Sequence, residues 1–490
     1  MNPATAPPPQ PPTETTTIAA LATARGSAGV AIIRLSGPEA WPIAEQLFSR
    51  PASQFKAGQV CHGWILDRST HRSAHPADPP PAVDEVLILP FQAPASFTGE
   101  DVIEIHCHGG EYLTQYILDL CYRAGATPAE PGAFTKRAFL NGKLDLTQAE
   151  SVLDMIQAQG ERLLMLASQN LKSRTLGHYL ETIRDALLQV QAPIVASVDF
   201  PDEVDEPNRQ DLHTQLQALQ TQVQAMVQSA KHNRMAREGF KVVILGPPNA
   251  GKSSLFNRLL ANNRAIVTEI AGTTRDLLSE TLVLEGIPIT LMDTAGIRET
   301  ENRVEVLGIE RTWQASETAD AILYLLEASE VFRSNSPGLP EEELAMLERL
   351  PPQVPTLIVV NKIDTLAPGK TLPTLLPPDR WADLLAISAQ TGHGIPKLLE
   401  WLGACLQTHA PTAHDQQALA ISLNHRQTQG LNAIEDCLQL ATETLNTPSH
   451  PIDLVTVPLS DALYHLDKLL GIDTTESVLD EVFSRFCVGK

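Results

Sequence analysis

The sequence has few basic residues, few aromatic side chains and few cysteines. Of its 490 residues, 36 are Lys or Arg against 58 Asp or Glu, a formal net charge of −22, and aromatic residues make up only 5%. This excess of acid argues against indiscriminate binding to nucleic acid or anionic membranes, because phosphates need compensating cations. Hydrophobic residues still make up 43% of the chain. The length and this composition predict a folded protein of about three domains.

Long apolar runs and cysteine motifs are also missing. The sequence contains no stretch of the roughly 18 apolar residues that a membrane span needs. Its six cysteines form no CxxC pair, so we expect no disulfide framework, and the reducing cytoplasm is the natural location. Residues 1–17 are rich in Pro and Thr and contain no Lys or Arg, which predicts a disordered lead-in rather than a signal or transit peptide.

Two short clusters carry residue types that bind metals, namely Cys61-His62 and His106-Cys107-His108. Adjacent residues on a strand point to opposite faces, so this spacing is poor for chelation. We therefore favour a structural role for these residues over a metal site.

The pattern of strand and helix signals divides the sequence into four segments. Residues 18–135 alternate strand and helix patterns, which predicts a mixed α+β domain, whereas residues 136–238 are helical with a break at 199–207. Residues 239–407 open with a buried strand and a glycine loop and then alternate strand and helix, the pattern of a doubly wound parallel sheet. Residues 408–490 return to helix, with helices expected at 413–446, 458–470 and 474–486. We therefore predict an α/β domain inserted into one helical domain, because short isolated helices would leave apolar faces uncovered.

A glycine-rich loop follows the first strand of the 239–407 segment. The sequence Gly246-Pro-Pro-Asn-Ala-Gly251-Lys252-Ser253 lies between a strand and a helix, the context that a phosphate-binding P-loop requires. Backbone N–H groups at the helix N-terminus would cradle the phosphates, Lys252 would neutralise the β/γ oxygens, and Ser253 would ligate Mg²⁺. Downstream, Asp293 can hold Mg²⁺ through water, and the N–H of Gly296 can meet the γ-phosphate.

The identity of the base is predicted by Asn361-Lys362-Ile363-Asp364, which follows an apolar strand. The Asp364 carboxylate can accept hydrogen bonds from both N1–H and the 2-amino group of guanine, and it would be buried unpaired against adenine. Lys362 would lie along the base plane, and Ser388-Ala389-Gln390 would close the pocket. These elements predict that the nucleotide is GTP rather than ATP.

The group that orients the hydrolytic water is harder to identify. The position after Gly296 is Ile297, which cannot position water as the Gln of many small GTPases does. Asn249 could help to hold a monovalent cation where an arginine finger acts in other systems, and Thr274 could complete the Mg²⁺ shell. An acid in the segment 297–310 could position the water; the candidates, each of which is otherwise a solvated surface charge, are Glu299, Glu301, Glu305 and Glu310.

Taken together, these motifs resemble the tRNA-modification GTPase family MnmE, also called TrmE. The matching segments are GPPNAGKSS (246–254), TEIAGTTRD (268–276), DTAGIRETENRVEVLGIER (293–311), NKID (361–364), CVGK (487–490), ARGSAGVAIIRLSG (24–37), SFTGEDVIEIHCHGG (96–110) and PGAFTKRAFLNGKLDLTQAE (131–150). The resemblance spans nearly everything after residue 17. It implies an N-terminal tetrahydrofolate-binding and dimerisation domain (18–135), a helical domain in two parts (136–238 and 408–490), and an inserted Ras-like P-loop G domain (239–407).

The resemblance also implies an activity and partners. The family works as a homodimer with a flavin-dependent partner, MnmG (GidA). Together they add a carboxymethylaminomethyl or aminomethyl group at C5 of the tRNA wobble uridine. GTP, Mg²⁺, K⁺ and 5-formyl- or methylene-tetrahydrofolate are the implied cofactors. A regulatory switch in ribosome assembly without modification chemistry is the alternative, because a P-loop and an NKID motif are common to both classes.

Residue roles follow from the same resemblance. Asn249, Thr268, Ile270 and Thr273 correspond to K⁺ ligands, Ser253 and Thr274 to Mg²⁺ ligands, Glu305 to the water-orienting acid, and Arg34, Glu104, Lys143 and Lys490 to folate contacts. Cys487 corresponds to the cysteine of the family's terminal motif and is a possible functional thiol. The residues expected to bind GTP are Asn249, Ala250, Gly251, Lys252, Ser253, Ser254, Thr268, Glu269, Ile270, Ala271, Gly272, Thr273, Thr274, Asp293, Thr294, Ala295, Gly296, Asn361, Lys362, Ile363, Asp364, Ser388, Ala389 and Gln390.

A surface for tRNA is suggested by the distribution of charge. Residues 136–238 carry 11 Lys or Arg against 13 acids, and five of those acids are packed into 199–206. The remainder of this segment is therefore net positive. We predict that tRNA meets a basic face formed by Lys136, Arg137, Arg162, Lys172, Arg174, Arg184, Lys231, Arg234 and Arg237.

Overall fold

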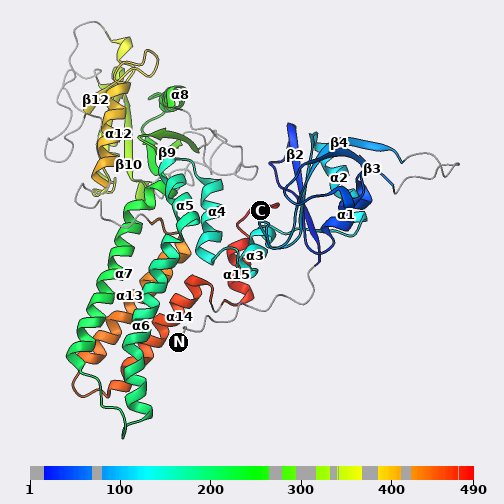
Figure 1. Ribbon diagram of the computed structural model, residues 1–490. Helices are drawn as coiled ribbons and strands as arrows, with labels where there is room; N and C mark the ends of the chain where they lie inside the picture. Colours follow the sequence, from blue (N-terminus) through cyan, green and yellow to red (C-terminus); the bar gives the residue numbers. More distant parts are fainter. Residues whose placement is uncertain are drawn as a thin grey trace, which may run out of the picture. The chain divides into compact units, whose positions relative to one another are not determined.

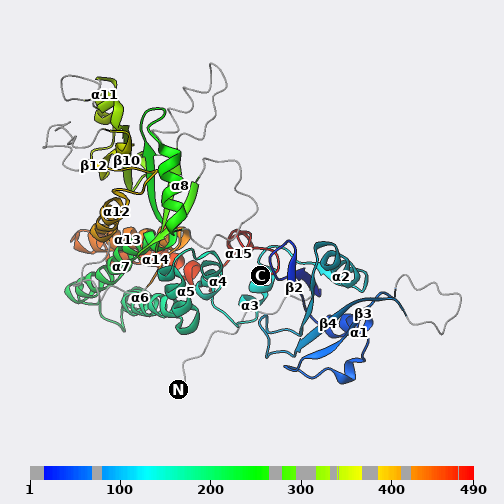
Figure 2. The same cartoon turned by 90° about the horizontal axis from the view of Figure 1, so that it is seen from above.

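The computed structural model describes residues 16–68, 80–263, 279–293, 316–331, 339, 341–366, 384–409, 421–472 and 474–490. It divides the chain into two compact units, which are treated separately below (Figures 1 and 2). The first unit comprises Met1–Leu153, Asn170–Leu219 and Asp436–Lys490, and the second comprises Asp154–Gln169 and Gln220–Glu435. The described parts of the chain contain no helix that is both long and apolar enough to cross a membrane.

The first unit contains a six-stranded sheet with the order β3-β4-β5-β2-β1-β6. Neighbouring strands are antiparallel except for the parallel pair β1 and β6. The strands are β1 (Ile18–Leu21), β2 (Ala28–Ser36), β3 (Cys61–Leu66), β4 (Ala82–Phe91), β5 (Val102–Gly109) and β6 (Thr127–Pro128), and the flanking helices are α1 (Ala40–Leu47) and α2 (Glu111–Arg123). Thr17 is buried and its carbonyl accepts from the N–H of Thr127, so ordered structure begins earlier than the predicted residue 18.

Strand alternation separates the two faces of this sheet. On β5, Ile103, Ile105 and Cys107 pack with α1 and α2 in one core, whereas Glu104 and His106 point to the opposite face. His106 and Cys107 therefore lie on opposite faces, as expected for adjacent residues of a strand. Burial raises the pKa of the Cys107 thiol to about 11, which makes it an inert core residue.

Helices make up the rest of the first unit, and some of them extend into the second. The run predicted as helical from residue 134 to 198 is broken at Asn141-Gly142, near Gly160 and at Arg174, which has a left-handed φ of 51°. The helices that result are α3 (Ala133–Leu140), α4 (Leu146–Gln157), α5 (Glu161–Ser173) and α6 (Thr175–Asp199). They are followed by α7 (Arg209–Glu238), α13 (His425–Asn446), η5 (Ile452–Val455), α14 (Thr456–Leu470) and α15 (Glu476–Phe483). The predicted break at 199–207 is confirmed.

The predicted helix 413–446 begins later than expected. Residues 410–420 lie outside the described residues, and residues 421–424 are not helical. The reason is a local cap at Asn424. Its side chain accepts from the N–H of Gln427 at 2.8 Å, while the Gln427 side chain accepts from the N–H of Asn424 at 2.9 Å. This reciprocal pair starts α13 at His425.

The second unit contains the predicted doubly wound sheet, in the order β12-β11-β10-β7-β9-β8. All neighbours are parallel except the hairpin β8–β9, whose turn residues Glu285 and Gly286 both have positive φ. The elements are β7 (Phe240–Leu245), α8 (Lys252–Asn263), β8 (Ser279–Leu284), β9 (Ile287–Asp293), β10 (Ala321–Glu327), α10 (Ala328–Val331), α11 (Glu341–Glu348), β11 (Thr356–Asn361), η3 (Ile363–Thr365), β12 (Leu384–Ala386) and α12 (Ile395–His409).

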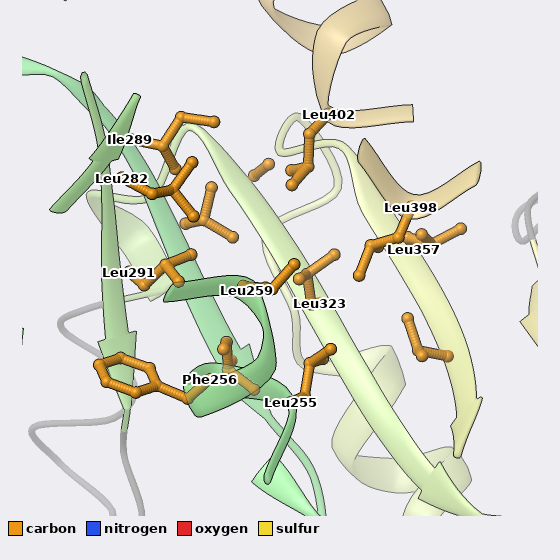
Figure 3. Packing of buried hydrophobic residues seen from close by; sticks show 14 of the residues in the cluster. Leu255, Phe256, Leu259, Leu282, Ile289, Leu291, Leu323, Leu357, Leu398 and Leu402 are labelled. Atoms are coloured by element: carbon orange, nitrogen blue, oxygen red, sulfur yellow. The ribbon is translucent and has the colours of Figure 1, made fainter. Parts of the chain in front are cut away.

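Both faces of this sheet are buried. On one face, Leu291, Leu323 and Leu357 from three strands pack with Leu259 of α8 and Leu398 of α12 (Figure 3). On the other face, a second cluster joins alternate residues of β7, β10 and β11 to α10 and α11. Burial on both faces explains why these strands are continuous apolar runs in the sequence. It also leaves the carboxyl ends of β7, β9, β11 and β12 at one edge, where loops can form a site.

Candidate functional site

The predicted P-loop connects β7 to α8, and its glycines are required by their surroundings. Gly246 has φ 136°, and a side chain there would collide with the carbonyl of Leu325 on β10. Gly251 has φ 91°, and a side chain there would collide with the Asn361 side chain on β11. The backbone of the loop is therefore held against two neighbouring strands, which only glycine permits.

Lys252 is the first residue of α8. Its Nζ donates to the carbonyls of Gly246 at 2.7 Å and Pro247 at 2.8 Å, so the ammonium lies over the loop that would cradle phosphate. Asn249 has a left-handed φ of 66°, and Ser253 is exposed in the first turn of the helix. An amide carbonyl and a hydroxyl at this helix N-terminus are suitable oxygen donors for K⁺ and Mg²⁺, respectively.

Asn361 joins the P-loop to the predicted base-binding loops. Its side chain is buried, with an exposed fraction of 1%. The Nδ2 donates to the carbonyl of Ala250 at 2.9 Å, and the Oδ1 accepts from the N–H of Ala389 at 3.0 Å. The backbone N–H of Ile363 also donates to the carbonyl of Ile387 at 3.3 Å. The motifs around residues 250, 361 and 389 are therefore one hydrogen-bonded assembly.

Lys362 is positioned by an acid that the sequence reasoning missed. Its Nζ lies 3.0 Å from Oε2 of Glu327, and Oε1 of Glu327 accepts from the Ser329 hydroxyl at 2.6 Å. Glu327 is the last residue of β10 and so ends at the same sheet edge as the nucleotide motifs, which is the signal that could have identified it. Asp364 lies two residues beyond Lys362 with an exposed side chain, free to meet a base.

Arg258 on α8 is a second residue that sequence reasoning missed. Its Nε donates to the carbonyl of Ala389 at 2.8 Å, and its Nη2 donates to the carbonyl of Gln390. The helix that begins at the P-loop therefore also holds the loop predicted to close the base pocket. No local motif marks this role, because the contact joins residues far apart in the sequence.

The structure describes only some of the remaining residues that are predicted to bind the nucleotide. Asp293 ends β9, and its backbone is in register with Ile244 of β7, so the strand ends at the expected edge. Thr268, Glu269, Ile270, Ala271, Gly272, Thr273, Thr274, Thr294, Ala295, Gly296 and Glu305 lie outside the described residues. The residues at 249–254, 361–364 and 388–390 are brought together.

A second constellation lies on the face of the N-terminal sheet opposite α1 and α2. Arg34 of β2 donates from Nε and Nη2 to the same Oε1 of Glu104 on β5, at 2.9 and 2.8 Å. The Arg34 guanidinium also lies 5.6 Å from the ring centre of Phe97 and 5.7 Å from that of Phe134. Both donors use Oε1, and the Oε2 of Glu104 lies 3.5 Å from Nε2 of His106.

Lys490 reaches this constellation because the segment 487–490 docks on the N-terminal domain. Val488 pairs with Pro131, and the N–H of Phe134 donates to the carbonyl of Lys490 at 3.2 Å. Gly489 has φ 96°, and a side chain there would collide with the carbonyl of Leu21. Burial, together with the positive charge of Arg34, lowers the pKa of Lys490.

The other predicted residues near this constellation are less closely joined to it. Lys143 donates from Nζ to the carbonyl of Pro94 at 2.9 Å, and so contacts the loop that carries Phe97. Cys487 is exposed three residues before Lys490. Of the four predicted folate residues, Arg34, Glu104 and Lys490 are thus neighbours, while Lys143 is connected to them through the loop.

Most of the predicted basic face is neutralised by local partners. The ion pairs are Lys136–Asp480, Arg137–Glu100, Arg174–Asp145, Arg174–Glu181, Arg184–Asp467, Arg234–Asp320 and Arg237–Asp154. Arg162 donates to the side chain of Asn233 at 3.0 Å. Lys172 is exposed, and nothing is placed for the side chain of Lys231. The charge counted from the sequence over residues 136–238 therefore overstates the positive charge that these residues present to a partner.

Comparison with known proteins finds relatives of this chain over nearly its whole length. Residues 17–143 match the model of the GTP-binding protein TrmE N-terminus, and residues 146–487 match that of the MnmE helical domain. The curated tRNA modification GTPase MnmE of Thermotoga petrophila is 40% identical over 477 residues, 97% of this chain and 100% of that protein. That of Synechococcus elongatus is 39% identical over 479 residues, 97% and 98% of the two chains. A structure of Aquifex aeolicus Era bound to GDP·AlF4⁻ is 28% identical over 41% of this chain and 67% of its own, with a TM-score of 0.27.

Replacing Arg258 by Ala should loosen the base pocket without touching the nucleotide directly. Hydrogen bonds that involve a charged donor contribute about 1.5–3 kcal/mol each, and about 1.4 kcal/mol corresponds to a factor of ten, so loss of both restraints predicts GDP dissociation at least roughly tenfold faster. Stopped-flow displacement of a fluorescent GDP analogue measures the rate. Arg234→Ala, which breaks ion pairs elsewhere in the same unit, is the control and should leave the rate unchanged. An unchanged rate for Arg258→Ala would contradict its positioning role.

Proposed function

This chain belongs to the MnmE family of tRNA modification GTPases, and we propose that it is a K⁺-activated GTPase acting on the wobble uridine of tRNA. With the flavin-dependent partner MnmG, it adds a carboxymethylaminomethyl or aminomethyl group at C5, using a one-carbon unit from 5-formyl- or methylene-tetrahydrofolate. We place the reaction in the cytoplasm and expect a homodimer through the N-terminal domain. The observation that carries the proposal is one chain with an assembled nucleotide site and a second Arg34–Glu104–Lys490 site.

The nucleotide chemistry follows from the loop geometry. The P-loop backbone and Lys252 would bind the phosphates, and Asp364 would select guanine, in a frame held by Asn361, Glu327 and Arg258. Ser253 and Thr274 would hold Mg²⁺, which neutralises phosphate charge when it is bound. The residues proposed to hold K⁺ are Asn249, Thr268, Ile270 and Thr273. Glu305 would orient the attacking water, because Ile297 carries no group able to do so.

The second site has the chemistry that a reduced folate requires. The Oε2 of Glu104, beside Nε2 of His106, could accept from the donors of the pterin ring, and Arg34 is held in place by two hydrogen bonds and two aromatic rings. Lys490 and Lys143 supply positive charge for the glutamate tail. Cys487 lies beside this site with an exposed thiol, which is a candidate group for the modification chemistry.

Analysis of modified nucleosides in tRNA tests the proposal. Deletion of the gene should remove the C5-modified wobble uridines. Wild-type protein should restore them, whereas a Lys252→Ala variant should not. Liquid chromatography with mass spectrometry on purified tRNA measures the change. Wobble uridines that are unaffected by the deletion would reject the enzyme and favour a regulatory switch in ribosome assembly.

The cation proposal predicts faster GTP hydrolysis in KCl than in NaCl at equal ionic strength. K⁺ fits a site of amide, hydroxyl and backbone oxygens and would supply positive charge to the transition state. Phosphate release measured at a protein concentration that permits dimerisation compares the two salts. Glu305→Ala should be slow in both salts while still binding GTP. Equal wild-type rates in the two salts would remove K⁺ from the mechanism.

Folate binding should weaken as the pH rises, and this decline should begin at a lower pH than it would for a lysine with the usual pKa. Burial and Arg34 lower the pKa of Lys490, so the free protein loses this ammonium below the usual lysine value of about 10.4. Because an anionic folate tail favours the protonated form, affinity falls as pH rises through the pKa of the free protein. Fluorescence titration with 5-formyl-tetrahydrofolate from neutral pH upward measures this decline. Lys490→Met should bind more weakly at neutral pH and lose the decline, whereas Lys143→Met should retain it.

A further inference from the structure

Apolar side chains are exposed where α6 and α14 meet at one end of the helices. Val195 and Val198 near the end of α6, Phe200 directly after it, Leu454 of η5 and Val457 of α14 have exposed fractions between 40% and 59%. We call these five residues the apolar ridge. Isolated exposed apolar residues are ordinary, but a contiguous group marks an interaction surface.

The register of α6 against α14 places these residues together. Arg184 contacts Asp467 at 2.6 Å, and the Gln191 side chain donates to the Ser460 hydroxyl at 2.7 Å. A step of seven residues forward on α6, from 184 to 191, matches a step of seven residues backward on α14, from 467 to 460. The two helices are therefore antiparallel neighbours (Figure 1). The same step brings Val198 beside residue 453. The ridge is therefore continuous across both helices.

A hollow adjoins the ridge. It is a cavity of about 490 Å³, and its lining combines the apolar residues Val198, Val204 and Ile452 with the acids Asp205, Glu206 and Asp453 and with Arg209. A long aliphatic stem that ends in a cation fits such a hollow, because the stem can lie against the apolar walls while the charge meets the carboxylates. A Lys or Arg side chain has this form.

The acids around the hollow are available to a partner. Among the described residues, no Lys or Arg forms an ion pair with Asp199, Asp202, Glu203, Asp205 or Asp453. Arg209 is the one cation among the lining residues of the hollow, and it donates to the carbonyls of Leu445 at 3.1 Å and His450 at 2.8 Å, with Glu206 at 3.7 Å. The rim therefore keeps a surplus of negative charge.

The surplus of negative charge favours some classes of binding partner over others. RNA and an anionic membrane would be repelled. A second copy docking by two-fold symmetry would bring the two acidic rims together, because an isologous interface matches a patch with itself. No group of acids in the described parts of the chain has the arrangement of a metal site. A protein surface with apolar side chains flanked by Lys or Arg is complementary both to the apolar ridge and to the acids of the hollow.

We propose that the apolar ridge and its acidic hollow are the docking surface for the protein partner, which inserts a Lys or Arg side chain between Asp205 and Asp453. The inference rests on the proposed function, since the occupant is the flavin-dependent protein named there. Apolar burial on the ridge would supply affinity, and the acidic rim would supply orientation and a faster association rate.

The full-length chain and the purified flavoprotein of the same organism test this surface by biolayer interferometry. The double variant Asp205→Lys/Asp453→Lys and the single variant Val457→Glu should each weaken binding at least tenfold. The charge reversal should also reduce the dependence of the association rate on salt. Matched controls on α13 are Glu443→Lys and Leu440→Glu, an exposed acid and an apolar residue that is 55% exposed. These controls should bind as the wild type does.

The possible failures are distinguishable. GTP hydrolysis and the unfolding temperature should be unchanged in all variants. If the variants that lose binding also unfold at a lower temperature than the wild type, the proposal is overturned. Binding by the ridge variants equal to that of the wild type would overturn the docking surface alone. Failure of the wild type to bind the flavoprotein would overturn both the docking surface and the partnership. A gain or loss of tRNA affinity on charge reversal, with flavoprotein binding intact, would assign the surface to RNA and reject the proposal.

Discussion

The buried amide of Asn361 is the interaction on which the nucleotide site depends. One side of this amide donates to the P-loop at Ala250 and the other accepts from Ala389, so three loops from different strands share one side chain. Neither an acid nor an apolar residue of similar size could satisfy both a buried carbonyl and a buried N–H. The strand ends bring the loops to the same edge of the sheet, and Asn361 sets their spacing there. Glu327 then restrains Lys362, the neighbour of Asn361, and Arg258 restrains the loop at Ala389.

The second site depends on a comparable constraint, the close approach of residues 487–490 to the N-terminal sheet. Gly489 lies so close to the Leu21 carbonyl that no side chain is tolerated, and the carbonyl of Lys490 is held by the N–H of Phe134. A side chain from one end of the chain is thereby delivered to a pair from the other, Arg34 and Glu104. This arrangement accounts in physical terms for a glycine between Cys487 and Lys490 in a segment that forms no regular element.

Much of this architecture could be predicted from the sequence, and the reasons for the rest are specific. Strands buried on both faces, such as β10 and β11, are recognisable as apolar runs, and the glycine loop marks where the first strand meets a helix. Arg258 and Glu327 could not be found in the same way, because their roles come from tertiary contacts rather than from local spacing. The start of α13 was misjudged because the cap formed by Asn424 and Gln427 outweighs the helical pattern of the preceding residues. In the folate set, adjacency of Arg34 and Glu104 follows from strand register, which spacing alone does not determine.

The distribution of charge links these features. The positive charge of residues 136–238 is largely consumed by ion pairs that hold helices together, such as Arg184 with Asp467 and Arg237 with Asp154. Such cations contribute little long-range attraction for RNA, because their fields are cancelled at close range. In contrast, within the described parts of the chain Asp199, Asp202, Glu203 and Asp205 form no ion pair with Lys or Arg. In the proposed function, recognition of tRNA then falls to a few free cations such as Lys172 or to the partner. In the proposed docking, a partner that covers the acidic hollow would also reduce the repulsion between these acids and RNA.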